Sequence, residues 1–217
     1  MENRRFQVPD YKDYEYSLLQ AYEIACKQIT GIEDIENQCR ISGSECKKVG
    51  QGWEITLSYL HQPCKITVPD VNVVSTDDGQ ELPLKEKVLV LHYFLGAKGV
   101  PVSGKMSAFG ELPEGKVYLR TFSKRTTNHL ARFFGNEPDR LLETGSKFGG
   151  YRTDYGDIAV TIPAFRFVPV TFVVWKGDEE FSPEANILFD STTPDYLSTE
   201  DIIVLCEVIT WKLVRSM

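Results

Sequence analysis

The sequence predicts an α+β fold (a mixed α/β chain) with a central, mostly antiparallel or mixed sheet and with the N- and C-terminal helices packed on it. Three observations predict this class. Apolar residues recur at helical spacing near both ends, they alternate with polar residues in the middle, and residues 168–175 are apolar at almost every position. Alternation is typical of a strand with one solvated face, and a continuous apolar run is typical of a strand covered on both faces.

Two long helices are predicted at the ends of the chain. The first begins after Pro9 with Asp10 as its N-cap, and Gly31 lies just past its end. The last begins after Ser198, whose hydroxyl can cap it, and it is apolar on more than one face, so we expect it to be largely buried. The stripes are Tyr11, Tyr14, Leu18, Tyr22, Ala25 and Ile29 in the first helix, and Ile202, Leu205, Cys206, Ile209 and Leu213 in the last.

The strands are predicted from changes of period and from turn residues. Residues 53–59 and 64–68 alternate and form a hairpin, with the turn at 60–63. Asp77-Asp78-Gly79 marks the next turn. Two further strands are predicted at 157–162 and 168–175, the second of them central in the sheet with Pro169 at its start. Residues 186–189 add a short strand.

Shorter helices are predicted between these strands. One spans Leu84 to Leu95, and another spans 126–134 and ends at Gly135. Asn136 is expected to cap a third that runs through Leu141 and Leu142. Residues 96–115 are expected to form a loop, and the polar stretch 32–50 shows no clear pattern.

The composition favours a single globular domain over residues 1–217 that works in the cytoplasm. The net charge of −7 argues against nucleic-acid binding, which requires dense positive charge. The 5 cysteines follow no C-x-x-C spacing, so we expect neither a disulfide framework nor a metal site. No apolar run approaches the ~20 residues that cross a bilayer, so we expect no membrane contact, and no motif implies a cofactor.

A basic segment is the first candidate for a binding site. Residues 101–150 contain 8 Lys/Arg and 5 Asp/Glu, whereas residues 151–217 contain 5 and 11. Lys124 and Arg125 are expected at the start of the helix over 126–134, where free backbone N–H groups attract a carboxylate or phosphate. A solvated helix face is the alternative. The candidate ligand-binding residues are Arg120, Lys124, Arg125, Asn128, His129 and Arg132.

An acidic segment after the strand over 168–175 is the second candidate. Three consecutive carboxylates, 178–180, stand where a turn is expected, and such oxygens can hold magnesium or calcium. The spacing of an EF-hand is absent, and a charged turn is the alternative, so we assign no metal. Asp190 follows the next apolar run and is predicted to be either a turn residue or a ligand. The candidates here are Trp175, Asp178, Glu180 and Asp190.

The remaining motifs identify no reaction. Residues 99–105 have the G-x-x-x-x-G-K spacing of a phosphate-binding loop, but Met106 stands where a Ser or Thr has to bind magnesium. His61, His92 and His129 are far apart, and the sequence contains no H-E-x-x-H or G-x-S-x-G motif. His92 lies beside an apolar stripe and is expected to pack rather than to catalyse.

One set of residues, mostly in the last third of the chain, is distinctive as a group. It comprises Val168-Pro-Val170, Trp175-x-Gly177-Asp178-x-Glu180-Phe181-x-Pro183, Leu188-Phe189-Asp190 and Tyr196-Leu197-x-Thr199-Glu200-Asp201, with Gly149-Gly150 and Asp157 upstream. In these residues the chain resembles the family catalogued as domain of unknown function 3786. Members are typical of anaerobic bacteria and archaea, and some are joined to a cysteine-rich iron–sulfur domain of the kind seen in corrinoid proteins.

The resemblance implies an accessory role in anaerobic redox or one-carbon (corrinoid-linked) metabolism, with an iron–sulfur or corrinoid protein as the partner. It supplies no catalytic residues, and this chain lacks the cysteine cluster, so it is not expected to bind an iron–sulfur cluster itself. The leading hypothesis is a binding module that recognises an anionic small molecule or a partner protein through 120–132 and the loop 145–157. The alternatives are an enzyme in which Asp178, Glu180 or Asp190 acts as acid, base or metal ligand, and a purely structural subunit.

Overall fold

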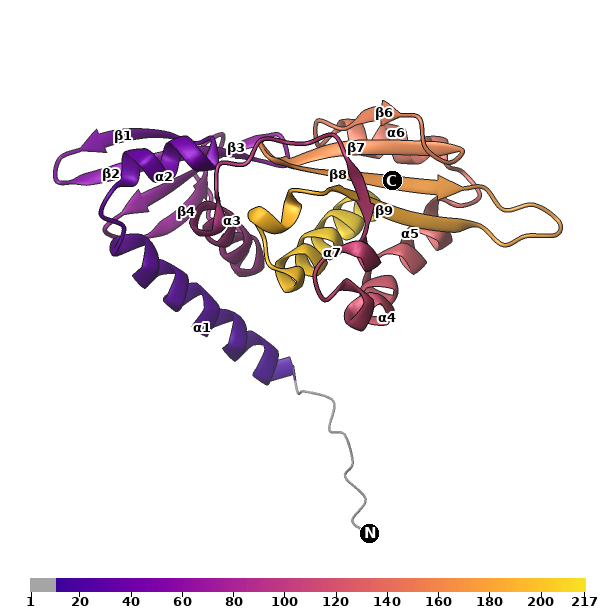
Figure 1. The fold of residues 1–217 in the computed structure, drawn as a ribbon, viewed down its shortest axis with the longest axis horizontal. Coiled ribbons are helices and arrows are strands. Elements are labelled where there is room, and N and C mark those ends of the chain that lie inside the picture. The colour runs from indigo at the N-terminus through magenta and orange to yellow at the C-terminus, as the bar shows by residue number, and fades with distance from the viewer. Residues whose placement is uncertain (1–10) are drawn as a thin grey trace, which may run out of the picture.

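The fold consists of two antiparallel sheets and the helices that pack on them, as Figure 1 shows. The computed structural model describes residues 11–217. The predicted α+β class is confirmed, and the sheets contain four and five strands. The first helix, α1, spans Tyr11–Thr30, and the predicted cap Asp10 lies outside the described residues.

The first sheet has the strand order β1-β2-β3-β4. The predicted hairpin is confirmed as β2 (Gly52–Tyr59) and β3 (Gln62–Val68), with Ile55 opposite Ile66. The buried residues Ile55, Leu57, Cys64 and Ile66 point to one face, as alternation requires. The stretch without a clear pattern forms α2 (Ile35–Ser42) and β1 (Glu45–Val49), and β4 (Asn72–Ser75) completes the sheet.

The second sheet has the order β5-β9-β8-β7-β6, so β8 (Val168–Trp175) is central as predicted. Its neighbours are β7 (Ile158–Phe165) and β9 (Glu184–Asp190), and the outer strands are β5 (Met106–Ala108) and β6 (Tyr151–Thr153). Nearly every residue of β7 and β8 is buried, which explains why their sequences do not alternate. The expected loop over 96–115 therefore contains β5, followed by a short 3₁₀ helix over Phe109–Glu111.

The helices that lie between β5 and β6 along the chain differ from the prediction at two boundaries. The basic segment ends α4 (Gly115–Arg125), and α5 (Thr127–Phe134) begins only after Thr126 leaves the helical conformation at φ −134° and ψ −83°. The prediction that Lys124 and Arg125 begin a helix is therefore wrong. Asn136 caps nothing, because α6 (Asp139–Ser146) begins after Pro138.

A contiguous core joins both sheets to α1, α3 (Leu84–Gly96) and α7 (Thr199–Arg215). The Ser198 hydroxyl accepts a hydrogen bond from the Asp201 N–H, which confirms the predicted cap, and the predicted stripe of α7 is buried. The 5 cysteines are free thiols. Over residues 11–217, no helix has both the length and the hydropathy to cross a bilayer.

Candidate functional site

The most basic element of the chain is α4, which contains Lys116, Arg120, Lys124 and Arg125 and no acidic residue. Lys124 and Arg125 lie in its last turn, where the helix dipole stabilises positive charge. The sequence had instead placed them at the start of the next helix, beside free backbone N–H groups that attract anions. The position of these two cations is therefore no sign of a bound anion.

Arg125 is already neutralised by the chain itself. Its guanidinium donates to Glu207 of α7 through Nη2 and, at 3.2 Å, through Nε. Lys85 of α3 approaches the same carboxylate oxygen at 3.4 Å. The three side chains are part-buried, so this cluster joins α3, α4 and α7 rather than facing a partner. Arg125 is the predicted ligand-binding residue that the geometry supports least.

The other exposed residues of α4 are different. At about 100° per residue Lys116, Val117, Arg120 and Lys124 project from one side of the helix, and Tyr118 and Leu119 lie on its two flanks; we call this surface the α4 face. Val117 is 79% exposed, and Tyr118 and Leu119 are also exposed. In the part of the chain that the structure describes, Arg120 and Lys124 form no ion pair. A hollow of about 440 Å³ lies between this helix and α7, and Tyr118, Ile203 and Glu200 line it.

The predicted residues of α5 do not form one polar face with Arg125. Asn128 and Arg132 are exposed one turn apart, and the Arg132 guanidinium lies 5.5 Å from the ring centre of Phe133. The His129 ring packs 4.7 Å from that of Trp211 in α7, which makes it a packing residue. The α5 residues thus extend the basic surface without enclosing a site.

The acidic segment lies in the loop between β8 and β9, which projects from the end of the sheet and away from α4 (Figure 1). Asp178 Oδ1 accepts hydrogen bonds from the N–H groups of Phe181 at 2.7 Å and Glu180 at 2.8 Å. These bonds, chiefly the one from Phe181, lower the pKa of Asp178. Trp175 and Glu180 are exposed beside it. The carboxylate of Asp178 thus shapes its own turn. The loop contacts the end of α5, where the Gly177 N–H donates to the Gly135 carbonyl at 3.4 Å, but within the described residues no ion pair joins Asp178 or Glu180 to a basic candidate.

Asp190 is 1% exposed and accepts five hydrogen bonds. Thr192 donates through N–H at 3.0 Å and its hydroxyl at 2.7 Å, Ser103 through N–H at 3.1 Å and its hydroxyl at 2.9 Å, and Gly104 through N–H at 2.7 Å. Burial by itself raises the pKa of Asp190, but these donors outweigh it and lower the pKa to about 2. Gly104 belongs to the segment with phosphate-loop spacing, so that segment binds an anion from its own chain.

His92 is the feature that the sequence reasoning missed. Its Nδ1 lies 2.7 Å from Asp201 Oδ1, and Asp201 Oδ2 accepts from the Ser198 hydroxyl at 2.6 Å. The hydrogen bond with Asp201 raises the pKa of His92 despite its partial burial. His92, Asp201 and Glu200 line a cavity of about 460 Å³ beside α1. Since 109 residues separate His92 from Asp201, no spacing rule could have paired them.

The fold and these sites define an α+β protein with a basic, exposed helix and with several clusters of charged side chains that pair with groups of their own chain. Residues 34–211 match the sequence profile of the family described as a domain of unknown function (DUF3786). The chain therefore belongs to that family, and the match extends well beyond the last third in which the resemblance was clearest. Comparison with curated proteins and with solved structures gives no match.

Proposed function

We propose that this protein is an accessory module that docks an acidic partner protein on its α4 face. One observation carries the proposal: α4 combines uncompensated positive charge with three exposed apolar side chains, in a chain whose net charge is −7. Large apolar side chains exposed at three consecutive positions of one helix are a feature of interaction sites. Opposite charge on a partner steers its approach and selects it against other proteins.

The α4 face supports a protein partner better than a small anion. Small-molecule sites are concave and enclose most of their ligand, whereas Arg120 and Lys124 stand on the outside of a helix. The hollow beside Tyr118 is bordered by Glu114, Glu200 and Arg125, and Arg125 already pairs with Glu207, so the hollow suits an uncharged side chain of a partner rather than an anion. Val117 lies on the same side of the helix as Arg120 and Lys124, and an exposed apolar side chain among cations matches the anatomy of a protein interface.

The nature of the partner rests on the family resemblance alone. An iron–sulfur or corrinoid protein of anaerobic redox or one-carbon metabolism is therefore the first partner to test. A free anionic metabolite is the alternative ligand of the same cations.

The test uses a charge reversal of the α4 face. Immobilised wild-type protein, the double variant Arg120→Glu/Lys124→Glu, and a control, Lys47→Glu/Lys48→Glu on exposed β1, are each incubated with cell extract. A protein retained by wild type and control but lost from the α4 variant is then purified and titrated by calorimetry. We expect the charge reversal to weaken its affinity about tenfold or more and added salt to weaken the wild-type complex.

Two results would contradict the proposal. The first is an α4 variant that retains the same proteins as the wild type. The second is a purified partner that binds both forms equally well. If no protein is retained, and the wild type binds citrate or phosphate while the α4 variant does not, the metabolite alternative is established instead.

The His92–Asp201 pair supports a second candidate, an enzyme acting on an anionic metabolite. A histidine held by a carboxylate, with its pKa raised and its ring on a cavity, has the form of a general base or acid. Lys85 and Arg125 line the same cavity, although Glu207 holds both. The test is turnover of a panel of phosphate and carboxylate esters: His92→Gln has to abolish any activity found, and activity that survives this change contradicts the candidate.

A further inference from the structure

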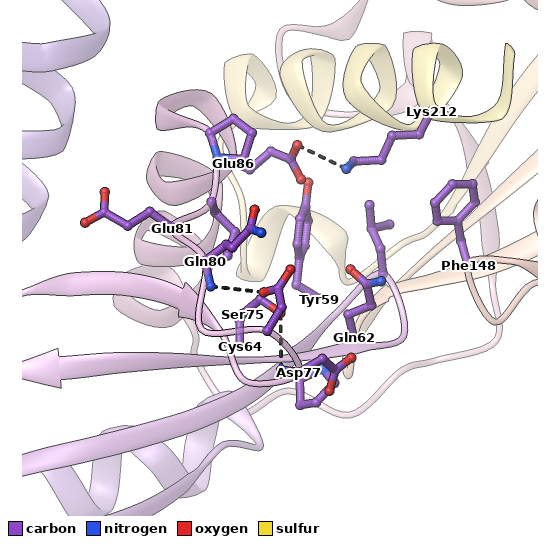
Figure 2. A pocket seen from close by; sticks show the side chains of 15 residues that line it. Tyr59, Gln62, Cys64, Ser75, Asp77, Gln80, Glu81, Glu86, Phe148 and Lys212 are labelled. Atoms are coloured by element: carbon purple, nitrogen blue, oxygen red, sulfur yellow. Dashed lines mark hydrogen bonds and ion pairs between the residues drawn. The ribbon is translucent and has the colours of Figure 1, made fainter. Parts of the chain in front are cut away.

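A separate cavity lies where the two sheets meet α7, and Figure 2 shows its lining. We call it the Glu86 cavity; its volume is about 240 Å³, enough for a small molecule and far more than one water needs. Its walls come from the β2–β3 turn, the segment between β4 and α3, Phe148 and Lys212 of α7. It lies outside the α4 face and the His92 cavity, and it plays no part in the proposed docking.

Two buried polar groups, Glu86 and Tyr59, lie together at the inner end of this cavity. Glu86 is 8% exposed and Tyr59 4%. Lys212 Nζ lies 3.1 Å from Glu86 Oε1, and the other carboxylate oxygen of Glu86 lies beside the Tyr59 hydroxyl. The Tyr59 hydroxyl approaches the Glu86 carboxylate as a donor (Figure 2), but the geometry is poor, and among the described residues the hydroxyl has no other hydrogen-bond partner. Unsatisfied buried groups of this kind are rare and costly in folded proteins.

The protonation state of Tyr59 is well defined. Burial raises its pKa well above the ordinary value of 10.0, and the charge of the Glu86 carboxylate and the hydroxyl's hydrogen-bonding contact with it raise the pKa further. Tyr59 therefore keeps its proton at neutral pH, and it presents a hydroxyl that can both donate and accept. The inner end of the cavity thus offers a carboxylate and a phenol, which together suit a ligand with several N–H donors.

The charge of the lining selects the sign of the ligand. Two of the four carboxylates are compensated: Lys212 pairs with Glu86, and Lys87 approaches Glu81 at 2.6 Å. The carboxylates of Asp77 and Asp78 are exposed at the rim and have no cation in the described part of the chain. The lining therefore attracts cations and repels anions.

The backbone around the cavity is held in place before any ligand binds. Leu60, which forms part of the wall, and His61 both have positive φ (50° and 67°), a conformation that non-glycine residues adopt only at a cost. The Leu60 N–H donates to the Ala164 carbonyl of β7 at 2.9 Å, which fixes this turn on the second sheet. At Gly149 a Cβ would come within 2.7 Å of the His61 side chain, so glycine is needed for the close approach. A rigid wall of this kind lowers the entropy lost on binding.

We propose that the Glu86 cavity binds a small organic cation, a primary amine or guanidinium on a short apolar body. The cationic head donates to Glu86 and Tyr59, and the body lies along Leu60, Leu82 and Phe148. Asp77 and Asp78 attract the ligand to the entrance. Because the site is a small cavity with an acidic lining, this ligand differs in both size and charge from the acidic partner of the α4 face.

The test titrates the full chain with putrescine, agmatine and tyramine, and with butyrate and succinate as anions at equal ionic strength. Binding is measured by calorimetry and by the shift in Tm. We expect at least one amine to bind saturably and neither anion to bind. Glu86→Gln keeps the size of the side chain and removes its charge, so it should weaken the amine about tenfold or more.

Two further variants make the test specific. Tyr59→Phe removes only the hydroxyl and should also weaken the amine, which keeps the proposal testable if Glu86→Gln does not fold. Glu54→Gln is the control, because Glu54 pairs with Lys65 at 3.2 Å on the surface of the first sheet, and it should bind as the wild type does. The proposal fails if no amine binds the wild-type protein, if the anions bind equally well, or if Glu86→Gln and Tyr59→Phe both bind with wild-type affinity.

Discussion

Asp190 and Glu86 are the two Asp or Glu residues of the described chain that are less than a tenth exposed, and their surroundings differ. Asp190 accepts five hydrogen bonds from a loop that wraps around it. Glu86 has one cation and a poorly aligned contact with the Tyr59 hydroxyl, and it lines a cavity. A buried carboxylate whose oxygens are saturated by its own chain holds the fold together. One that is not saturated has capacity left for a ligand.

The largest effect that this comparison predicts is at Asp190. Asp190→Ala leaves buried donors from Ser103, Gly104 and Thr192 without an acceptor, and it should lower the free energy of unfolding by about 3 kcal/mol. Urea denaturation measures the change. Asp195→Ala is the matched control, because Asp195 pairs with exposed Lys98 at 3.0 Å and should cost less than about 1 kcal/mol. Equal losses in the two variants would show that saturation of the carboxylate does not matter.

Acid unfolding gives the next largest effect. The pKa of Asp190 is lowered from 3.8 to about 2 in the folded protein. Its contribution is therefore complete above pH 3.8 and is lost as the pH falls toward 2, by about 2 kcal/mol in all. The difference in stability between wild type and Asp190→Asn should shrink over this pH window. A difference that stays constant from pH 5 to about 2 would contradict the assignment.

Asp201 is an intermediate case, a part-buried carboxylate shared by His92 and Ser198. The pKa of His92 is raised above its ordinary value of 6.5, chiefly by the hydrogen bond with Asp201. The stabilisation is therefore complete below pH 6.5 and is lost as the pH rises through the raised pKa. Wild type should lose about 0.5 kcal/mol over that rise relative to His92→Gln. Titration of the His92 ring by NMR checks the direction, and a pKa below 6.5 would reverse the prediction.

The smallest expected effect is at Tyr59, where its sign is the test. Tyr59→Phe removes a hydroxyl whose contact with Glu86 has poor hydrogen-bond geometry and which has no other partner among the described residues, so stability should be unchanged or rise by up to about 0.3 kcal/mol. Thermal unfolding measures it, with Tyr93→Phe as the control. The Tyr93 hydroxyl donates to the Ser42 carbonyl at 2.8 Å, and its loss should be destabilising. A clear loss of stability in Tyr59→Phe would mean that the hydroxyl is satisfied within the chain.

Most of the fold was predictable from sequence because its signals are local. The β2–β3 hairpin follows from alternation, the central place of β8 follows from its apolar run, and α7 follows from the Ser198 cap and its buried stripe. The break at Thr126 was not predictable from periodicity. Its hydroxyl donates to the Phe122 carbonyl at 2.7 Å, and α4 ends there although the polar pattern continues.

The sites were less predictable because their partners are distant in the chain. Asp190 was expected to be a turn residue or a ligand, and it does accept the Thr192 N–H as a turn residue does, but its bonds to Ser103 and Gly104 span 86 or 87 residues. Glu207 neutralises Arg125 across 82 residues. The Glu86 cavity combines Tyr59, Phe148 and Lys212, none of which stands out in a sequence. Composition indicated that charge is unevenly distributed, but only the packing shows which charged side chains are already neutralised within the chain.

The loop around Asp190 acts as a receptor whose ligand is covalently attached. Five donors already stand in place there, so shortening the side chain by Asp190→Gly should open a small vacancy shaped for a carboxyl group. Free formate or acetate could then enter from solution and restore part of the lost stability, which is chemical complementation of a fold rather than of a reaction.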